Sequence, residues 1–265
     1  MRYAPEQYKT QGVYVWTVDL SLIAEVPLEW LTLLGADEFV RCQRFRLAKD
    51  RTAFAAAHAA TRVALASFVR LSPLALRFAK NRYGKPLLME NPRCHFNLSH
   101  TQDGVAVAVA WDREIGIDIE KLDRAFYDPG LMQAVCSEAE LSWLQRMEAT
   151  YQAYGFLKLW TAKEAVMKAE GLGLSLPPRS VWVDSRGDTA RVIGPSGRVR
   201  QCWALWHCRP TLTHLVALTL PLGSRQVVHR HLEPWELTEW VVSKTAARAP
   251  AERERGRERP RLRQV

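Results

Sequence analysis

Residues 115–120 read Ile-Gly-Ile-Asp-Ile-Glu. Successive side chains of a β-strand point to opposite faces, so the isoleucines share one face, and Asp118 and Glu120 share the other. A face of β-branched apolar residues is typical of a strand that packs on a core. The stretch therefore predicts a half-buried strand with two carboxylates on its second face.

A second stretch, residues 156–168, predicts a helix with an acid and a base on one stripe. Trp160, Glu164 and Lys168 are spaced four residues apart, so they lie above one another on a helix. If this helix packs on the strand, three carboxylates can meet, and oxygen ligands suit Mg²⁺ beside a phosphate. Each stretch alone also fits an ordinary solvated face, because acidic pairs and Glu–Lys pairs are common there.

Length and composition set limits on the class of protein. The chain has 265 residues, enough for one large domain or two smaller ones, and it is 48% hydrophobic and 25% charged. No apolar run approaches the ~18 residues that span a bilayer, and residues 1–6 do not resemble a secretory signal. We therefore expect a cytoplasmic protein without a membrane partner. Five scattered cysteines without a CxxC pair do not favour a disulfide framework or a structural zinc site.

The charge is concentrated at one end of the chain. The net charge is +9, and residues 244–265 hold eight basic and three acidic residues. The rest keeps a smaller positive excess, which suits anionic partners such as phosphates or an acidic protein. Residues 241–265 contain hardly any apolar side chain, so we expect a basic disordered tail.

Local patterns predict the remaining elements. Strands are expected at 11–20, 87–89, 105–111, 180–184 and 215–220, and helices at 50–69, 137–147 and around Glu164 up to Gly171. A turn is expected at 81–86 and a loop at 94–99. The two halves show a similar order of elements, so a degenerate duplication is an open alternative.

Several basic residues could bind phosphates, although most surface Lys and Arg are only solvated. Gly84-Lys85-Pro86 is a rigid turn that could present an ammonium at a fixed place. His100 lies in an expected loop beside two hydroxyls and is a candidate for a hydrogen bond to phosphate. The other basic candidates are Arg41, Arg44, Arg51, Lys80, Lys163 and Lys168.

Three motifs together resemble the 4'-phosphopantetheinyl transferase family, in its larger monomeric surfactin-synthetase type. The first is Asn97-Leu98-Ser99-His100 after the Gly-Lys-Pro turn, and the second is Gly116-Ile117-Asp118-Ile119-Glu120. The third comprises Trp160, Lys163, Glu164, Lys168, Gly171 and Gly173. The resemblance covers roughly residues 10 to 222.

The resemblance implies a fold and a reaction. The fold is an α+β arrangement of two similar halves related by pseudo-twofold symmetry, with the active site in the cleft between them. An N-terminal half (1–113) would contact coenzyme A phosphates, and a C-terminal half (114–240) would hold the metal site and the catalytic helix. The reaction is magnesium-dependent transfer of 4'-phosphopantetheine from coenzyme A to a serine of an apo acyl or peptidyl carrier protein, with release of adenosine 3',5'-bisphosphate. Fatty-acid, polyketide and nonribosomal-peptide carriers fit equally well.

The resemblance also implies roles for single residues. Asp118, Glu120 and Glu164 would bind the metal, Glu164 would activate the serine directly or through water, and Lys168 would stabilise developing charge. Coenzyme contacts would come from Arg41, Lys80, Lys85, Pro86, Ser99, His100, Asp118, Lys163 and Lys168. The sequence departs from the pattern at His58, where many relatives carry arginine.

Two other classes compete with this interpretation. The pI and the Arg-rich tail fit a nucleic-acid-binding protein, but the sequence has no helix-turn-helix, zinc-finger or RNA-binding signature. A different magnesium enzyme acting on a nucleotide or acyl-CoA would explain the acids but not the complete third motif, and a Walker-type loop is absent. We therefore expect no nucleic-acid partner, and a monomer, because one chain carries both halves of the cleft.

Overall fold

The computed structural model describes residues 12–122, 128–184, 188–224 and 226–246. It is a mixed α+β fold. Its helices are α1 (Leu28–Leu31), α2 (Ala36–Gln43), α3 (Ala48–Val69), α4 (Pro129–Val135), α5 (Glu138–Gln145), α6 (Ala149–Glu170) and α7 (Pro234–Ala246), with short 3-10 turns η1 (Pro73–Ala75), η3 (Gly173–Ser175) and η4 (Pro178–Ser180). Its strands are β1 (Gly12–Asp19), β2 (Phe78–Lys80), β3 (Pro86–Leu88), β4 (Cys94–Thr101), β5 (Gly104–Trp111), β6 (Gly116–Lys121), β7 (Val181–Val183), β8 (Thr189–Ile193), β9 (Val199–Cys208), β10 (His214–Pro221) and β11 (Gln226–Leu232).

The first sheet has the strand order β11-β1-β5-β4. The predicted strand near 11–20 and the predicted helix at 50–69 are confirmed as β1 and α3. Alternating residues of β1 and β5, such as Trp16 and Val107, form one core with the alanine-rich side of α3. Small side chains let the 22-residue helix lie close to the strands.

The second sheet has the order β6-β10-β9-β8-β7, and α6 covers it. The predicted strands at 180–184 and 215–220 and the capping box at Ser137 are confirmed. The predicted end of α6 is also confirmed, because Gly171 follows the helix with φ +65°, a conformation that glycine adopts without strain.

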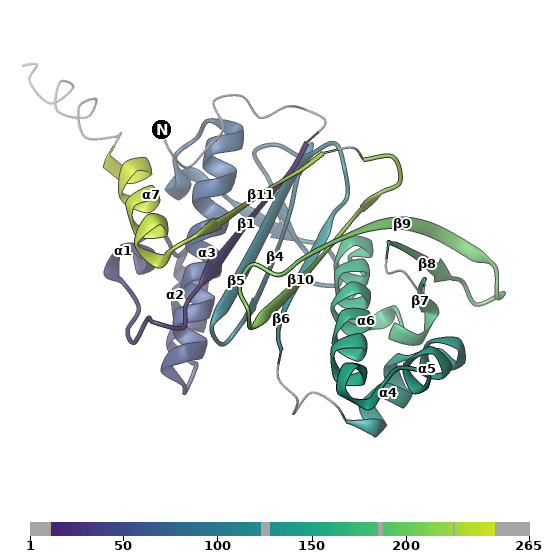
Figure 1. The fold of residues 1–265 in the computed structure, drawn as a ribbon. Helices are drawn as coiled ribbons and strands as arrows, with labels where there is room; N and C mark the ends of the chain where they lie inside the picture. Colours follow the sequence, from purple (N-terminus) through teal and green to yellow (C-terminus); the bar gives the residue numbers. More distant parts are fainter. Residues whose placement is uncertain (1–11, 123–127, 185–187, 225, 247–265) are drawn as a thin grey trace, which may run out of the picture.

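The two sheets pack against each other between these helices. Facing side chains of β1 and β5 meet those of β6 and β10 in a third apolar cluster, to which β5 contributes only alanines. In Figure 1 the long helix α3 lies to the left of β1, β4 and β5, and α6 lies to the right of β6 and β10. The layers are therefore helix, sheet, sheet and helix.

Gly116 sets how closely α6 lies on β6. A Cβ atom at this position would overlap the backbone of Ala165 and Ala169, which no rearrangement of side chains can relieve. Only glycine permits this contact. It brings the residues of β6 that follow Gly116 directly under the helix.

Two predictions about the chain are wrong. The pattern at 94–99 predicts a loop, but these residues belong to β4, whose polar side chains Asn97 and Ser99 are buried and hydrogen-bonded rather than solvated. The composition of residues 241–246 predicts the start of a disordered tail, but α7 continues to Ala246, and Trp240 and Val241 are buried. Residues 247–265 lie outside the described residues.

After β10 the chain returns to the first sheet. β11 pairs in parallel with β1, so residues 226–232 belong to the first sheet. Trp240 of α7 packs on Trp16 with ring centroids 5.5 Å apart. The last described segment therefore packs on the first sheet and completes its core.

Within the described ranges, α3 is the one helix long and apolar enough to cross a membrane by length and composition. Of its apolar window, 83% is buried inside the fold. That burial is typical of the core helix of a folded domain.

Candidate functional site

Two carboxylates of β6 face α6, as the alternation predicts. Asp118 Oδ1 accepts a hydrogen bond from Lys168 Nζ at 2.6 Å, and Glu120 Oε1 accepts one from Trp160 Nε1 at 3.0 Å. Both donors lie on α6, so the strand face and the helix stripe meet. This contact confirms the predicted packing of the two stretches.

The neighbouring strand β4 adds a hydroxyl to the same point. Ser99 Oγ donates to Asp118 Oδ1 at 2.8 Å and accepts from Lys168 Nζ at 2.8 Å. Two residues earlier, Asn97 Oδ1 accepts the backbone N–H of Ile117 at 2.9 Å. The three motifs, far apart in the sequence, are therefore joined by direct hydrogen bonds.

The carboxylates of this centre repel one another. Burial raises the pKa of Glu120 to about 7, with the charge of Asp118 adding to the effect and the Trp160 N–H opposing it. Burial, followed by the charge of Asp118, also raises the pKa of Glu164. The centre thus holds more negative charge than its own cations neutralise.

A divalent cation bound here would neutralise this excess of negative charge. Asp118 Oδ2 is buried and accepts no hydrogen bond from any residue that the structure describes. An orphaned carboxylate oxygen is costly to bury, and a hard cation prefers oxygen ligands of this kind. The donor set fits Mg²⁺, but in the described part of the chain no three acidic, His or Cys side chains are arranged so that they could hold a metal ion.

A pocket of about 700 Å³ begins at this centre and extends along α2 and α3. Ser99, His100 and Lys168 line one end of it. The pocket is also lined by Glu38, Arg41, Phe54, His58, Arg62, Arg77, Phe78, Lys80, Pro86 and Leu98. Six of the predicted coenzyme contacts therefore surround one cavity: Arg41, Lys80, Pro86, Ser99, His100 and Lys168.

Three nitrogen-bearing side chains of this pocket gather around the ring of Phe54. The Arg41 guanidinium lies 5.4 Å from the ring centroid, and the imidazoles of His58 and His100 lie 4.2 and 6.2 Å from it. Burial, followed by the positive charges of His58, Lys168 and Arg41, lowers the pKa of His100 to about 4. At neutral pH His100 is therefore an uncharged hydrogen-bonding group beside permanent cations.

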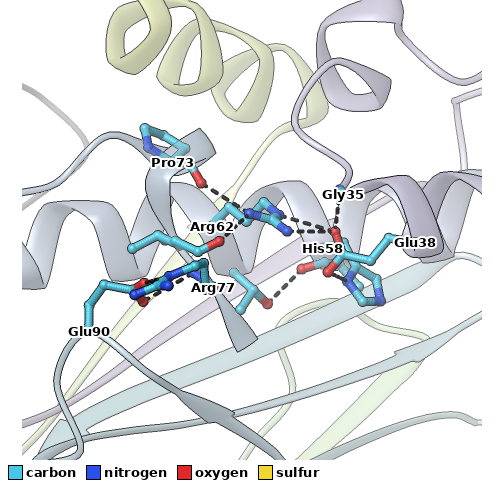
Figure 2. A network of polar contacts seen from close by, with 10 residues as sticks. Gly35, Glu38, His58, Arg62, Pro73, Arg77 and Glu90 are labelled. Carbon is cyan, nitrogen blue, oxygen red and sulfur yellow. Dashed lines mark hydrogen bonds and ion pairs between the residues drawn. The ribbon is translucent and has the colours of Figure 1, made fainter. Parts of the chain in front are cut away.

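Figure 2 shows the network that supports the far wall of the pocket. Glu38 binds His58 Nδ1 at 3.0 Å and Arg62 at 2.9 Å, and it accepts the N–H of Gly35 at 2.7 Å. Burial alone would raise the pKa of Glu38, but His58, Gly35 and Arg62 outweigh it and lower this pKa to about 2. Nearby, Arg77 pairs with Glu90 at 3.0 Å. The network connects α2 to α3 and fixes the orientation of His58.

A second, smaller pocket of about 330 Å³ lies on the other side of Lys168. The 81–86 turn, with Lys85, lines one wall, and Glu164, Met167 and Gly171 line the other. Both pockets share Gly84, Pro86, Leu98 and Lys168. Lys168 therefore stands where the two cavities adjoin.

The structure corrects the prediction for Lys163. Its side chain is fully buried and lines neither pocket; its ammonium pairs with Glu140 Oε2 at 2.8 Å. It also donates to the carbonyl oxygens of Pro178 and Val181. Lys163 precedes Lys168 by five residues, and at about 100° per residue the two side chains leave α6 in different directions. In this structure the Lys163 ammonium therefore supports the packing of α6 and lies outside both pockets.

Lys85 lines the second pocket, but its ammonium is already bound. Nζ donates to Glu114 Oε2 at 2.6 Å, to the Ala169 carbonyl at 2.9 Å and to the Ile115 carbonyl at 3.4 Å. The side chain is 9% exposed. A phosphate contact by Lys85 would require these bonds to break.

Sequence reasoning missed the supporting residues. Trp160 and Asn97 lie in the quoted motifs, but their hydrogen bonds to Glu120 and Ile117 depend on which segments pack together. Glu38 and Arg62 do not belong to any of the three motifs. They are 24 residues apart in the sequence, and nothing in the sequence indicates that they pair.

Comparison with known proteins agrees with this geometry. The family model described as the 4'-phosphopantetheinyl transferase superfamily matches residues 114–217, which include β6 and α6. A protein named 4'-phosphopantetheinyl transferase from Bacillus subtilis is 33% identical over 180 residues, covering 68% of this chain and 78% of that protein. The 4'-phosphopantetheinyl transferase Sfp of Bacillus subtilis strain 168 is 31% identical over 170 residues, covering 64% and 73%. The 4'-phosphopantetheinyl transferase gsp of Aneurinibacillus migulanus is 37% identical over 116 residues, covering 44% and 46%.

Proposed function

The chain belongs to the 4'-phosphopantetheinyl transferase superfamily, and we propose that it transfers 4'-phosphopantetheine from coenzyme A to a serine of an apo acyl or peptidyl carrier protein. The products are the holo carrier and adenosine 3',5'-bisphosphate, and the reaction depends on magnesium. One observation carries the proposal. Lys168 Nζ lies 2.6 Å from Asp118 and 2.8 Å from Ser99, so residues of all three motifs meet where the large pocket begins.

The large pocket takes the nucleotide part of coenzyme A. Its cationic lining supports phosphate binding by Arg41, Lys80 and Lys168, and Ser99 and His100 add neutral hydrogen-bond donors. The phosphoric anhydride then lies at the Lys168 end, beside Asp118. The volume of about 700 Å³ is in the range of pockets that enclose a ligand of this size.

The metal ligands in this proposal are Asp118, Glu120 and Glu164, which magnesium would have to draw together, because the described structure does not hold three such side chains in a metal-binding arrangement. A magnesium ion bound by them would withdraw charge from the anhydride oxygens. Glu164 lines the small pocket beside Lys168, and in this proposal it accepts the proton of the carrier serine directly or through one water molecule. The serine oxygen bonds to the β-phosphorus, and the bond to the leaving bisphosphate breaks. The Lys168 ammonium stabilises the charge that the leaving group gains.

Further proposals concern the chain as a whole. Each sheet is covered on its outer side by a 22-residue helix, which supports two similar halves related by pseudo-twofold symmetry, divided near residue 113, with the active site between them. A net charge of +9 supports electrostatic attraction of an acidic carrier protein. Since one chain supplies every residue of the proposed site, we propose a monomer, and we place it in the cytoplasm.

Mass spectrometry of an intact apo carrier protein tests the function. The carrier is incubated with the protein, coenzyme A and Mg²⁺, and the controls are EDTA and a carrier whose serine is replaced by alanine. The proposal predicts one phosphopantetheine adduct and an equal amount of adenosine 3',5'-bisphosphate, with neither formed in the controls. A carrier mass that stays unchanged across fatty-acid, polyketide and peptide carriers would refute it.

A further inference from the structure

The turn between β2 and β3 reaches across to the C-terminal end of α6. Asn81 Nδ2 donates to the Gly171 carbonyl at 2.8 Å, and Lys85 Nζ donates to the Ala169 carbonyl at 2.9 Å. The last carbonyls of a helix have no partner within the helix, and a cation there is favoured by the helix dipole. We call Asn81 and Lys85 the α6 clamp, because both hold the end of this helix from another segment.

The turn itself is preorganised for this contact. Asn81 Oδ1 accepts the backbone N–H groups of Tyr83 and Lys85, both at 2.9 Å, and the Asn81 N–H donates to the Lys85 carbonyl at 3.0 Å. Gly84 has φ +92°, which a residue with a side chain rarely adopts. The two clamp residues are therefore held at a fixed spacing, and each presents its donor to α6.

The clamp also contacts the chain just before β6. The Lys85 ammonium pairs with Glu114 at 2.6 Å and donates to the Ile115 carbonyl. His95 of β4 binds the second oxygen of Glu114 at 3.2 Å. One ammonium thus connects the segment that leads into the Asp118 strand with the helix end that follows Lys168. All three of its N–H donors have acceptors, so it has none to spare for a phosphate.

The residues that depend on this position of α6 are those of the proposed reaction. Glu164 and Lys168 lie within the last two turns before Ala169 and Gly171, and they line the small pocket opposite the clamp turn. A shift of the helix end would change the 2.6 Å contact between Lys168 and Asp118. Displacements of about 1 Å at a reacting centre are enough to slow a reaction by about a hundredfold.

We propose that Asn81 and Lys85 are positioning residues that keep Glu164 and Lys168 in register with Asp118, and that Lys85 is not a phosphate ligand. This inference rests on the proposed function for its kinetic consequence, but the clamp itself can be observed without any transfer reaction. It also changes what a Lys85 variant should do: turnover falls, while coenzyme A still binds.

Two variants that remove the clamp in chemically different ways test the inference. Lys85→Met removes the ammonium and keeps the length of the side chain. Asn81→Asp keeps the acceptor for the turn N–H groups but replaces the donor that faces Gly171. The control is Arg93→Met, which removes an exposed cation that pairs with Asp112 at 2.6 Å and does not line either pocket.

Three measurements are made on the full chain: hydrogen–deuterium exchange of the peptide covering residues 165–173, the coenzyme A dissociation constant by calorimetry, and turnover on an apo carrier. In both clamp variants we expect exchange in this peptide to accelerate by about tenfold. Turnover should fall by about tenfold or more while the dissociation constant changes less than about threefold. Arg93→Met should match the wild type in all three.

The outcomes separate the alternatives. If Lys85→Met weakens coenzyme A binding by about tenfold while Asn81→Asp behaves as the wild type, Lys85 is a phosphate ligand and the proposal is wrong. Unchanged exchange at 165–173 in both variants would also overturn it, as would faster exchange with normal turnover. If the wild type transfers no phosphopantetheine, the exchange data still decide whether the clamp exists, and only the proposed function fails.

Discussion

Replacing Lys163 by methionine removes an ammonium that is fully buried beneath α6. The ammonium lies 2.8 Å from Glu140 and donates to the carbonyls of Pro178 and Val181. Deleting one partner of a buried ion pair costs about 3–5 kcal/mol, because the other charge stays buried. We therefore expect a large loss of stability and no direct loss of a coenzyme contact.

The hydrogen bonds that Glu140 keeps place the expected loss of stability at the lower end of this range. Glu140 still accepts the N–H groups of Ser137 at 2.7 Å and Val183 at 3.0 Å, so its charge is not left without donors. We expect Lys163→Met to lower the free energy of unfolding by about 3 kcal/mol. Burial lowers the pKa of Lys163 although Glu140 opposes this, so the charged pair is costly to bury. The double variant Lys163→Met, Glu140→Gln removes the unpaired charge and keeps one acceptor oxygen for these N–H groups, so it should recover part of the loss.

Urea unfolding followed by tryptophan fluorescence measures the stability of the wild type, both single variants and the double variant. Calorimetry at a temperature where all four are folded measures their affinity for coenzyme A. We expect the four affinities for coenzyme A to be equal within about threefold. A Lys163→Met protein that loses less than about 1 kcal/mol of stability but binds coenzyme A tenfold more weakly would show that Lys163 contacts phosphate after all.

Three other changes test separate parts of the account. Lys168→Ala should lower kcat more than it weakens coenzyme A binding, because the ammonium acts mainly on the charge of the leaving group. Lys168→Arg should restore only part of the rate. Equal losses in coenzyme A binding and in kcat would contradict this role of Lys168. The pKa of Glu38 is about 2 in the folded chain against an ordinary 4.5, so its stabilising effect is complete above about pH 4.5 and is lost as the pH falls toward 2. Acid unfolding curves should therefore converge for the wild type and Glu38→Gln at low pH and separate at neutral pH, whereas a constant separation would refute the assignment. A chain that ends after Ala246 should keep its turnover on a carrier at physiological salt, and a large rise in KM at low salt would instead show that the Arg-rich tail recruits the acidic partner.

The sequence is most informative where one segment determines its own geometry. Alternation places Asp118 and Glu120 on one face of a strand, and the four-residue spacing places Trp160 and Lys168 on one stripe of a helix; the hydrogen bonds between these residues confirm both. The end of α6 at Gly171 follows equally from local chemistry.

The sequence misleads where the answer depends on a distant partner. Asn97 and Ser99 make β4 look like a loop, because nothing local reveals that Ile117 and Asp118 will satisfy them inside the fold. The parallel pairing of β11 with β1 joins segments more than 200 residues apart, which no local pattern encodes.

The basic residues show the same limit. From the sequence alone, Lys85 and Lys163 are candidates for phosphate binding like any other basic residue. In the folded chain, Lys85 pairs with Glu114 and Lys163 pairs with Glu140. Their partners lie 29 and 23 positions away in other elements, so spacing alone could not predict these pairs.

The most direct test of the central claim is the rate of phosphopantetheine addition to an apo carrier, followed by intact mass at increasing Mg²⁺ for the wild type and for Asp118→Asn. The substituted amide would keep the size of the side chain and an oxygen for the Ser99 and Lys168 bonds, but it would lose the charge of the buried Oδ2 atom. We expect a saturable Mg²⁺ dependence in the wild type and a rate loss of about a thousandfold or more in the variant. Equal rates in the two proteins, or a wild-type rate that does not respond to Mg²⁺, would contradict it.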